Sequence, residues 1–145
     1  MTVVASALPD PRPEDCVFCG IVAGRVPARR VAEDEHTVSF LDLGPATRGH
    51  CLVVPRTHAR DLLAVSPADL AACAVAARSL AARLVERLGA TGVNVLNACG
   101  TSAWQTVPHL HLHVVPRYDE DGMTVPWRAL SAPAEELDAT AALLA

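Results

Sequence analysis

The stretch PHLHLHVVPR, residues 108–117, places three histidines at alternate positions of the chain. Because successive side chains of an extended strand point to opposite faces, His109, His111 and His113 share one face. The leucines between them face the other way and suit packing on a core. The pattern predicts a β-strand with a row of imidazoles on one side. Imidazole is the side chain best suited to nucleophilic, acid–base or metal chemistry near neutral pH.

The rest of the chain predicts an antiparallel sheet with one long helix packed on it. The helix is expected over Pro67–Leu88, where apolar residues recur at helical spacing between Ser66 as N-cap and Gly89 as stop. A short helix is expected over Pro133–Leu144. Runs rich in Val, Leu and Phe predict strands at Val31–Ala32, Thr37–Leu41, Cys51–Val54 and Gly92–Leu96. Together these elements make an α+β fold.

Length and composition fit one globular domain. The chain has 145 residues, of which 51% are hydrophobic. Residues 1–13 carry three prolines and are expected to form a flexible tail, and residues 14–145 a single domain. A net charge of −4 argues against a nucleic-acid partner, and no apolar run has the length that would span a membrane. The five cysteines are an odd number without a signal peptide, so we expect reduced thiols in the cytoplasm.

Three roles would explain the histidine row. Two of its histidines can reach one metal ion if the strand bends, but the row alone does not form a closed site. A neutral imidazole can instead attack an electrophile while its neighbours move protons. The third reading is a pH-sensitive or histidine-rich patch. Gln105 and Thr106, just upstream, favour catalysis, because their side chains suit the binding of phosphate or oxyanion oxygens.

The segment Gln105–Arg117 resembles the signature of the histidine triad (HIT) superfamily. Two further blocks resemble the same family and occur in the same order, Cys16–Pro27 and Ser39–His58, so that the resemblance runs from about Asp15 to Trp127. It implies the HIT fold and an enzyme that acts on the α-phosphate of a purine nucleotide. Within the superfamily it points to the branch of nucleoside phosphoramidases and dinucleoside polyphosphate hydrolases, in the form of a zinc-containing bacterial protein.

The resemblance assigns the chemistry to His111, the middle histidine. It implies that His111 attacks the α-phosphorus of a nucleoside phosphoramidate or dinucleoside polyphosphate to form a nucleotidyl–histidine intermediate as the leaving group departs, and that water then releases nucleoside monophosphate. His113 would help charge balance and leaving-group protonation, while Gln105 and Thr106 would contact phosphate or leaving-group atoms. These four residues would also bind the nucleotide. Four further residues would join them: Asp42, whose carboxylate suits the ribose hydroxyls, Phe40 and Leu43, which would form apolar walls for the base, and Asn97.

A second resemblance within the family concerns metal. Cys16 and Cys19 have the spacing of half a zinc site, although redox motifs share that spacing. A subset of HIT proteins completes the site with two histidines, which match His58 and His109 in this chain. Four protein ligands leave no open coordination position, so the expected zinc is structural and the chemistry itself requires no cofactor.

Two positions depart from the family pattern. Many relatives have a polar residue where this chain has Ala98 and a glycine where it has Trp104. Trp104 would narrow the leaving-group side of the site, stack on a nucleotide base, or pack on a dimer partner. The departures keep two alternatives open: a nucleotidyl transferase or phosphorylase that uses the same intermediate, and a nucleotide-binding scaffold with little turnover. The resemblance also implies a homodimer, for which the Ala-rich helix Pro67–Leu88 is a candidate surface.

Three residues receive structural interpretations. His36 is expected to be a solvated turn residue. His50 is expected to be structural at the start of a strand, without a partner for chemistry. Trp127 is expected to anchor the carboxy-terminal segment.

Overall fold

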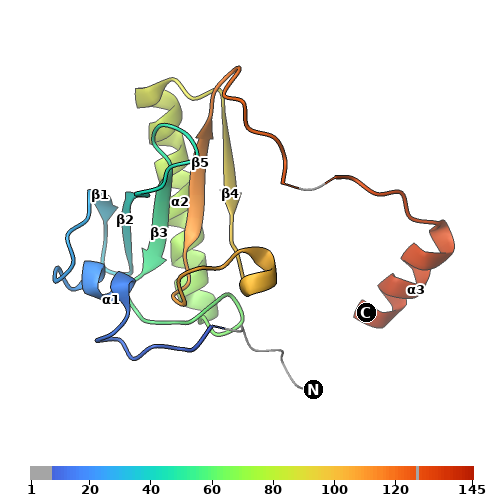
Figure 1. Cartoon of the computed structure of the whole chain (residues 1–145), viewed down its shortest axis with the longest axis horizontal. Coiled ribbons are helices and arrows are strands. Elements are labelled where there is room, and N and C mark those ends of the chain that lie inside the picture. The colour runs from blue at the N-terminus through green and yellow to red at the C-terminus, as the bar shows by residue number, and fades with distance from the viewer. Residues whose placement is uncertain (1–7, 127) are drawn as a thin grey trace.

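A five-stranded antiparallel sheet forms the centre of the molecule (Figure 1). The computed structural model describes residues 8–126 and 128–145. The sheet order is β1-β2-β3-β5-β4, and every neighbouring pair is antiparallel. The strands are β1 (Arg30–Glu33), β2 (Thr37–Leu41), β3 (Cys51–Pro55), β4 (Gly92–Leu96) and β5 (Leu112–Arg117). The helices are α1 (Val17–Val22), α2 (Pro67–Leu88), the 3₁₀ turn η1 (Thr101–Ala103) and α3 (Ala134–Leu144). The predicted α+β class is confirmed.

The two faces of the sheet carry different layers. The long helix α2 covers one face, where Cys73, Ala77, Leu80 and Leu84 pack on alternate residues of β3 and β5. The short helix α1 covers part of the other face through a second apolar cluster that includes Phe18. Leu110, Leu112 and Val114 all belong to the cluster under α2. The predicted alternation is therefore confirmed, and the histidines between these residues face the side of α1.

The histidine strand begins later than the sequence suggests. We expected a strand from His109 onward, but β5 starts at Leu112. The preceding backbone bonds to loops rather than to a neighbouring strand, because the Leu110 amide donates to the Ala59 carbonyl at 2.7 Å. The alternation of faces nevertheless continues through this irregular segment.

Helix α2 has the predicted bounds because its caps are local. Ser66 Oγ accepts a hydrogen bond from the Asp69 amide at 3.1 Å, and Pro67 occupies the first turn. Gly89 ends the helix with a φ of 69°, in the left-handed region that glycine tolerates without steric cost. The strands Thr37–Leu41 and Gly92–Leu96 also have the predicted bounds.

Gly49 fixes the approach of β3 to the end of α2. Its φ is 91°, and a Cβ there would lie 2.5 Å from Leu88 Cδ1. We expect Gly49→Ala to lower the free energy of unfolding by about 2–4 kcal/mol, from backbone strain and overpacking together. Gly89→Ala is the matched control, because its φ is also positive but no atom lies within 4 Å of the new Cβ. Urea unfolding should show a smaller loss for the control, and equal losses would contradict the packing argument.

The carboxy-terminal helix α3 lies apart from the sheet. All residues of α3 are exposed, and Figure 1 shows this helix beyond the β4 side of the sheet. Near the amino terminus, Asp10 contacts His58, and the first seven residues of the predicted tail 1–13 lie outside the described residues. The expected anchor Trp127 lies outside the described residues. Among the described residues, no helix combines the length and apolarity needed to cross a bilayer.

Candidate functional site

A cavity of about 250 Å³ opens on the α1 side of the sheet. Its lining brings together α1, the end of β2 and the histidine segment, and most of the lining surface is apolar. Of the residues proposed for chemistry and nucleotide binding, six line it: Phe40, Asp42, Leu43, Thr106, His111 and His113. Gln105 and Asn97 are not among the lining residues.

The His111 ring is held in one orientation. Its Nδ1 lies 2.7 Å from the His109 carbonyl oxygen, which can only accept, so Nδ1 carries the proton. In the neutral ring Nε2 then has a free lone pair. Phe18 supports the ring edge-on, with centroids 5.2 Å apart and planes at 86°. Burial lowers the pKa of His111, which favours the neutral, nucleophilic form at neutral pH.

The backbone of His111 is anchored from β4. Asn97, which follows that strand, donates from Nδ2 to the His111 carbonyl at 3.0 Å. The Asn97 Oδ1 atom is buried and has no hydrogen-bond partner within the described part of the chain. Asn97 therefore positions the histidine segment from behind the cavity, and its side chain is not one of the cavity walls.

His113 belongs to a cluster that the sequence analysis missed. The His50 Nε2 atom lies 2.9 Å from His113 Nδ1, and Asp42 Oδ2 lies 3.6 Å from the same His50 atom. The expectation that His50 lacks a partner is wrong. Register explains the contact, because Leu52 of β3 pairs with His113, and His50, just before β3, lies two residues earlier and on the same side as Leu52. Its place directly after Gly49 in a block that resembles the family was the available signal.

Burial sets the protonation of this cluster. It lowers the pKa of His113 to about 4 and also lowers the pKa of His50, while the Asp42 carboxylate acts in the opposite direction. Asp42 Oδ1 accepts a hydrogen bond from the Gly44 amide at 2.8 Å, which fixes the carboxylate at the cavity wall. His36, by contrast, is exposed and pairs with Glu35, as expected for a solvated turn residue.

Phe40 and Leu43 line the cavity in different ways. Phe40 is buried and packs edge-on against Phe18, with ring centroids 5.4 Å apart. Leu43 is 86% exposed at the rim. The pair offers one rigid apolar wall and one open edge, which suits a flat ring that enters from solvent.

Gln105 has its amide group fully engaged. Its Nε2 donates to the carbonyls of Arg60 and Val107, and its Oε1 accepts from the Gly100 amide. Thr106, the next residue, is exposed and lines the cavity. Trp104 is 62% exposed and has a φ of 70°, a conformation that glycine adopts more readily than tryptophan.

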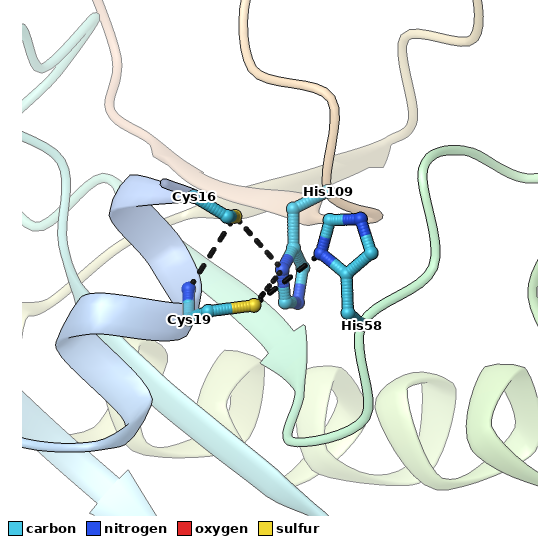
Figure 2. A group of neighbouring side chains, drawn as sticks. All are labelled: Cys16, Cys19, His58 and His109. Atoms are coloured by element: carbon cyan, nitrogen blue, oxygen red, sulfur yellow. Dashed lines mark hydrogen bonds between the residues drawn. The ribbon is translucent and has the colours of Figure 1, made fainter. Parts of the chain in front are cut away.

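Four side chains converge beside the cavity in a second cluster (Figure 2). Cys16 and Cys19 come from the start of α1, His58 from the loop after β3, and His109 from the segment before β5. Cys16 Sγ lies 3.4 Å from His109 Nδ1, and Cys19 Sγ lies 3.3 Å from His58 Nδ1 and 3.5 Å from His109 Nδ1. The structure thus brings together all four residues expected to bind metal.

Hydrogen bonds at the Nε2 atoms of His109 and His58 orient both rings. His109 Nε2 donates to the Pro55 carbonyl at 3.0 Å, and His58 Nε2 donates to Asp10 Oδ1 at 2.9 Å. Both rings therefore turn an Nδ1 lone pair toward the two sulfurs. In tetrahedral zinc sites a sulfur and a nitrogen ligand lie about 3.5 Å apart, given bonds of about 2.3 Å and 2.0–2.1 Å. The observed separations match this geometry, so the donor set fits a zinc ion.

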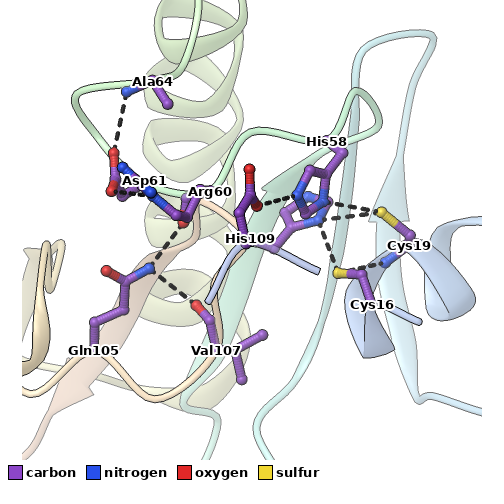
Figure 3. A network of polar contacts seen from close by, with 10 residues as sticks. Cys16, Cys19, His58, Arg60, Asp61, Ala64, Gln105, Val107 and His109 are labelled. Carbon is purple, nitrogen blue, oxygen red and sulfur yellow. Dashed lines mark hydrogen bonds and ion pairs between the residues drawn. The ribbon is translucent and has the colours of Figure 1, made fainter. Parts of the chain in front are cut away.

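A polar network supports the loop that carries His58 (Figure 3). Asp61 is buried, accepts hydrogen bonds from the Leu63 and Ala64 amides, and pairs with Arg60 at 3.0 Å. The Gln105 amide ties the Arg60 carbonyl to the segment that enters the histidine row. Gln105 therefore joins the two parts of the chain that supply His58 and His109.

Comparison with known proteins identifies the family. The HIT domain matches residues 23–120 of this chain. The chain belongs to the HIT family. A HIT family protein of Bacillus anthracis has the same fold, with a TM-score of 0.83 and 34% identity over 90% of this chain and 95% of that one.

Two further relatives bear on the site. The crystal structure of a Zn-bound histidine triad family protein of Mycobacterium smegmatis is 40% identical, covers 92% of this chain and 97% of that one, and has a TM-score of 0.75. An adenosine 5′-monophosphoramidase of Schizosaccharomyces pombe is 34% identical over 125 residues, which are 86% of this HIT protein and 91% of the yeast protein.

Proposed function

We propose that this HIT protein is a nucleotide hydrolase that cleaves at the α-phosphate of nucleoside phosphoramidates or dinucleoside polyphosphates. The observation that carries the proposal is the His111 ring, whose Nδ1 proton is held by the His109 carbonyl beside the cavity. That contact leaves Nε2 as the nucleophilic nitrogen. The yeast relative named as a phosphoramidase supports the choice of reaction.

The reaction proceeds in two displacements. His111 Nε2 forms a bond to the α-phosphorus, and the bond from phosphorus to the leaving amine or phosphate breaks with its electron pair. The leaving amine takes up a proton that water supplies. The remaining hydroxyl group of that water then bonds to phosphorus and breaks the phosphorus–Nε2 bond, which releases nucleoside monophosphate and neutral His111. Two lower barriers replace one high barrier.

The cavity walls provide the nucleotide site in this proposal. Phe40 and Leu43 would hold the purine base, Thr106 would contact the phosphate or leaving group, and His113 would lie beside the α-phosphate. Asn97 and Gln105, predicted as ligands, contribute instead through the backbone that they hold. A substrate panel with adenosine 5′-phosphoramidate and a dinucleoside polyphosphate tests the function. No release of nucleoside monophosphate from either substrate type would contradict it.

Asp42 is proposed to accept hydrogen bonds from the ribose hydroxyls. We expect wild-type protein to prefer a ribonucleoside substrate over its 2′,3′-dideoxy analogue by about tenfold or more in kcat/KM, the value of a hydrogen bond to a charged group. Asp42→Ala should lose most of this preference, chiefly through KM. The dideoxy substrate serves as the internal control, because its turnover should change little between the two proteins. An undiminished preference in the variant would contradict the assignment.

Zinc is proposed as a structural cofactor held by Cys16, Cys19, His58 and His109. The separations of the ligand atoms and the orientation of both rings support this site, as does the zinc-bound relative. When bound, zinc would hold the thiols as thiolates, against the burial that raises the pKa of Cys19 to about 12 in its absence. Since all four positions would be protein groups, the ion would tie α1 to the histidine segment and take no part in the reaction.

The homodimer and the cytoplasmic location remain predictions. The sheet edge at β4 carries exposed apolar side chains, Val95 and Leu96, with the exposed Trp104 nearby in sequence. This edge is a more favourable dimer surface than α2, whose apolar stripe is already covered by the sheet.

A further inference from the structure

A backbone amide sets the protonation state of His50. The Ala46 N–H lies 3.0 Å from His50 Nδ1 and donates to it. A peptide N–H can only donate, so Nδ1 must be the unprotonated nitrogen of this ring. The single proton of neutral His50 is therefore on Nε2. His50 is buried, so water does not offer either nitrogen an alternative partner at low cost.

The same constraint passes to His113. His50 Nε2 lies 2.9 Å from His113 Nδ1, and only one proton fits between the two nitrogens. Since that proton belongs to His50, the His113 Nδ1 atom accepts it as a hydrogen bond. The proton of His113 is then on Nε2, the nitrogen that is free for a substrate in the cavity that His113 lines.

Neither ring can become a cation without breaking a contact. A second proton on His50 would face the Ala46 N–H, and a second proton on His113 would face the His50 N–H. The charged and titratable groups around the pair act in opposite directions. Asp42 Oδ2, 3.6 Å from His50 and 4.0 Å from His113, favours a cation, whereas the neighbouring ring of His111, 5.0 Å from that of His113, disfavours it. The hydrogen bonds from Ala46 to His50 and from His50 to His113 decide the balance in favour of two neutral rings.

We propose that the Ala46 amide, acting through His50, locks His113 as a neutral imidazole with its proton on Nε2. His113 then acts toward the phosphate as a neutral hydrogen-bond donor rather than as a cationic acid, and His50 is a positioning residue. The assignment of the proton stands on the contacts alone. The role toward phosphate rests on the proposed function.

The same hydrogen bonds also affect whether Asp42, His50 and His113 can bind a metal ion. Asp42, His50 and His113 offer ligand atoms within 4.8 Å of one another, a spacing that a divalent cation could bridge. Coordination would require His50 Nε2 and His113 Nδ1 to be unprotonated together. The displaced proton would have to move to His50 Nδ1, against the Ala46 N–H. The lock therefore disfavours metal binding beside the nucleophile.

Nitrogen NMR of the zinc-loaded protein tests the proton assignment without any substrate. Long-range ¹H–¹⁵N spectra at pH 7 should show His113 protonated on Nε2 and bare on Nδ1. His50→Gln should preserve this pattern, because its amide N–H can replace the donor to Nδ1. His50→Leu removes the donor, so we expect a proton on His113 Nδ1, facing Asp42. Protonation of Nδ1 in the wild-type protein, or an unchanged pattern in His50→Leu, would overturn the proposal.

Turnover tests the role of the neutral donor. Relative to wild type, His50→Leu should lower kcat roughly tenfold or more, the loss typical of a misplaced donor at a reacting group. His50→Gln should recover most of that loss, which a merely structural role for an imidazole would not allow. The same pair of substitutions at exposed His36 is the control and should leave kcat unchanged. Equal losses in folded His50→Gln and His50→Leu would overturn the catalytic part, while the NMR result would still decide the tautomer.

Discussion

Replacement of His111 by alanine should abolish hydrolysis of both substrate types. We expect kcat to fall roughly 10⁴-fold or more, because the other imidazole that lines the cavity, His113, does not have an unprotonated Nε2 that could attack phosphorus. His113 cannot substitute, since its Nδ1 is engaged with His50 and its Nε2 carries the proton. Product release followed by chromatography measures the effect. His111→Ala should still bind nucleoside monophosphate, because the walls of the cavity remain.

Mass spectrometry distinguishes a lost nucleophile from a damaged site. Rapid quenching of wild-type protein in alkaline denaturant during turnover should trap a nucleotidyl group on the peptide that contains His111. The His36→Ala variant should give the same adduct, because that ring is exposed at a turn away from the cavity. Full turnover by His111→Ala, or an adduct on a different residue of the wild-type protein, would contradict the proposed mechanism.

Local signals explain which elements the sequence predicts well. Helix α2 has the bounds expected from Ser66 and Gly89, because both caps are satisfied within four residues of their own position. The alternation through the histidine segment is likewise a property of the chain itself, so the leucines reach the α2 side and the histidines the α1 side even where strand pairing is absent. Such features do not depend on what the rest of the fold supplies.

Contacts between distant segments explain what the sequence analysis did not predict. His50 appeared isolated because its partner His113 is 63 residues away, and only the register between β3 and β5 brings them together. Gln105 was predicted to contact phosphate because its amide suits that role, and in the structure the carbonyl of Arg60, 45 residues away, accepts a hydrogen bond from the same amide. The start of β5 at Leu112 has the same cause, since the Ala59 carbonyl takes the Leu110 amide.

His109 links the two clusters of the site. Its ring faces the two cysteines, while its carbonyl oxygen accepts the Nδ1 proton of His111. Any contact that fixes the His109 ring therefore also fixes the His109 carbonyl oxygen, which orients the ring of His111. The resemblance to the family predicted the four metal ligands and the nucleophile, but only the structure shows that His109 contacts both of these groups through different atoms.

Loss of zinc should therefore damage stability and catalysis together. We expect Cys19→Ser to purify without stoichiometric zinc and to lose about 3–5 kcal/mol of unfolding free energy, a fraction of the large binding energy of structural zinc sites. For a chain of this length such a loss lowers Tm by roughly 10–20 °C. Metal content by mass spectrometry and Tm by calorimetry measure the two effects. Turnover should fall as well, because α1 and His109 lose their common anchor.

Cys99→Ser is the matched control, because it makes the same substitution at a cysteine that is not a proposed zinc ligand. Cys99 is partly buried and is not one of the four proposed zinc ligands, so its variant should keep one zinc per chain and nearly wild-type Tm. Treatment of wild-type protein with a strong chelator should reproduce the Cys19→Ser phenotype, and added zinc should reverse it in the wild type alone. Because Cys16 and Cys19 bind zinc as thiolates, protons compete with the metal, and zinc should be released as the pH falls. Wild-type protein that contains no zinc when prepared without chelator, or a Cys19→Ser variant with unchanged Tm, would refute the structural role.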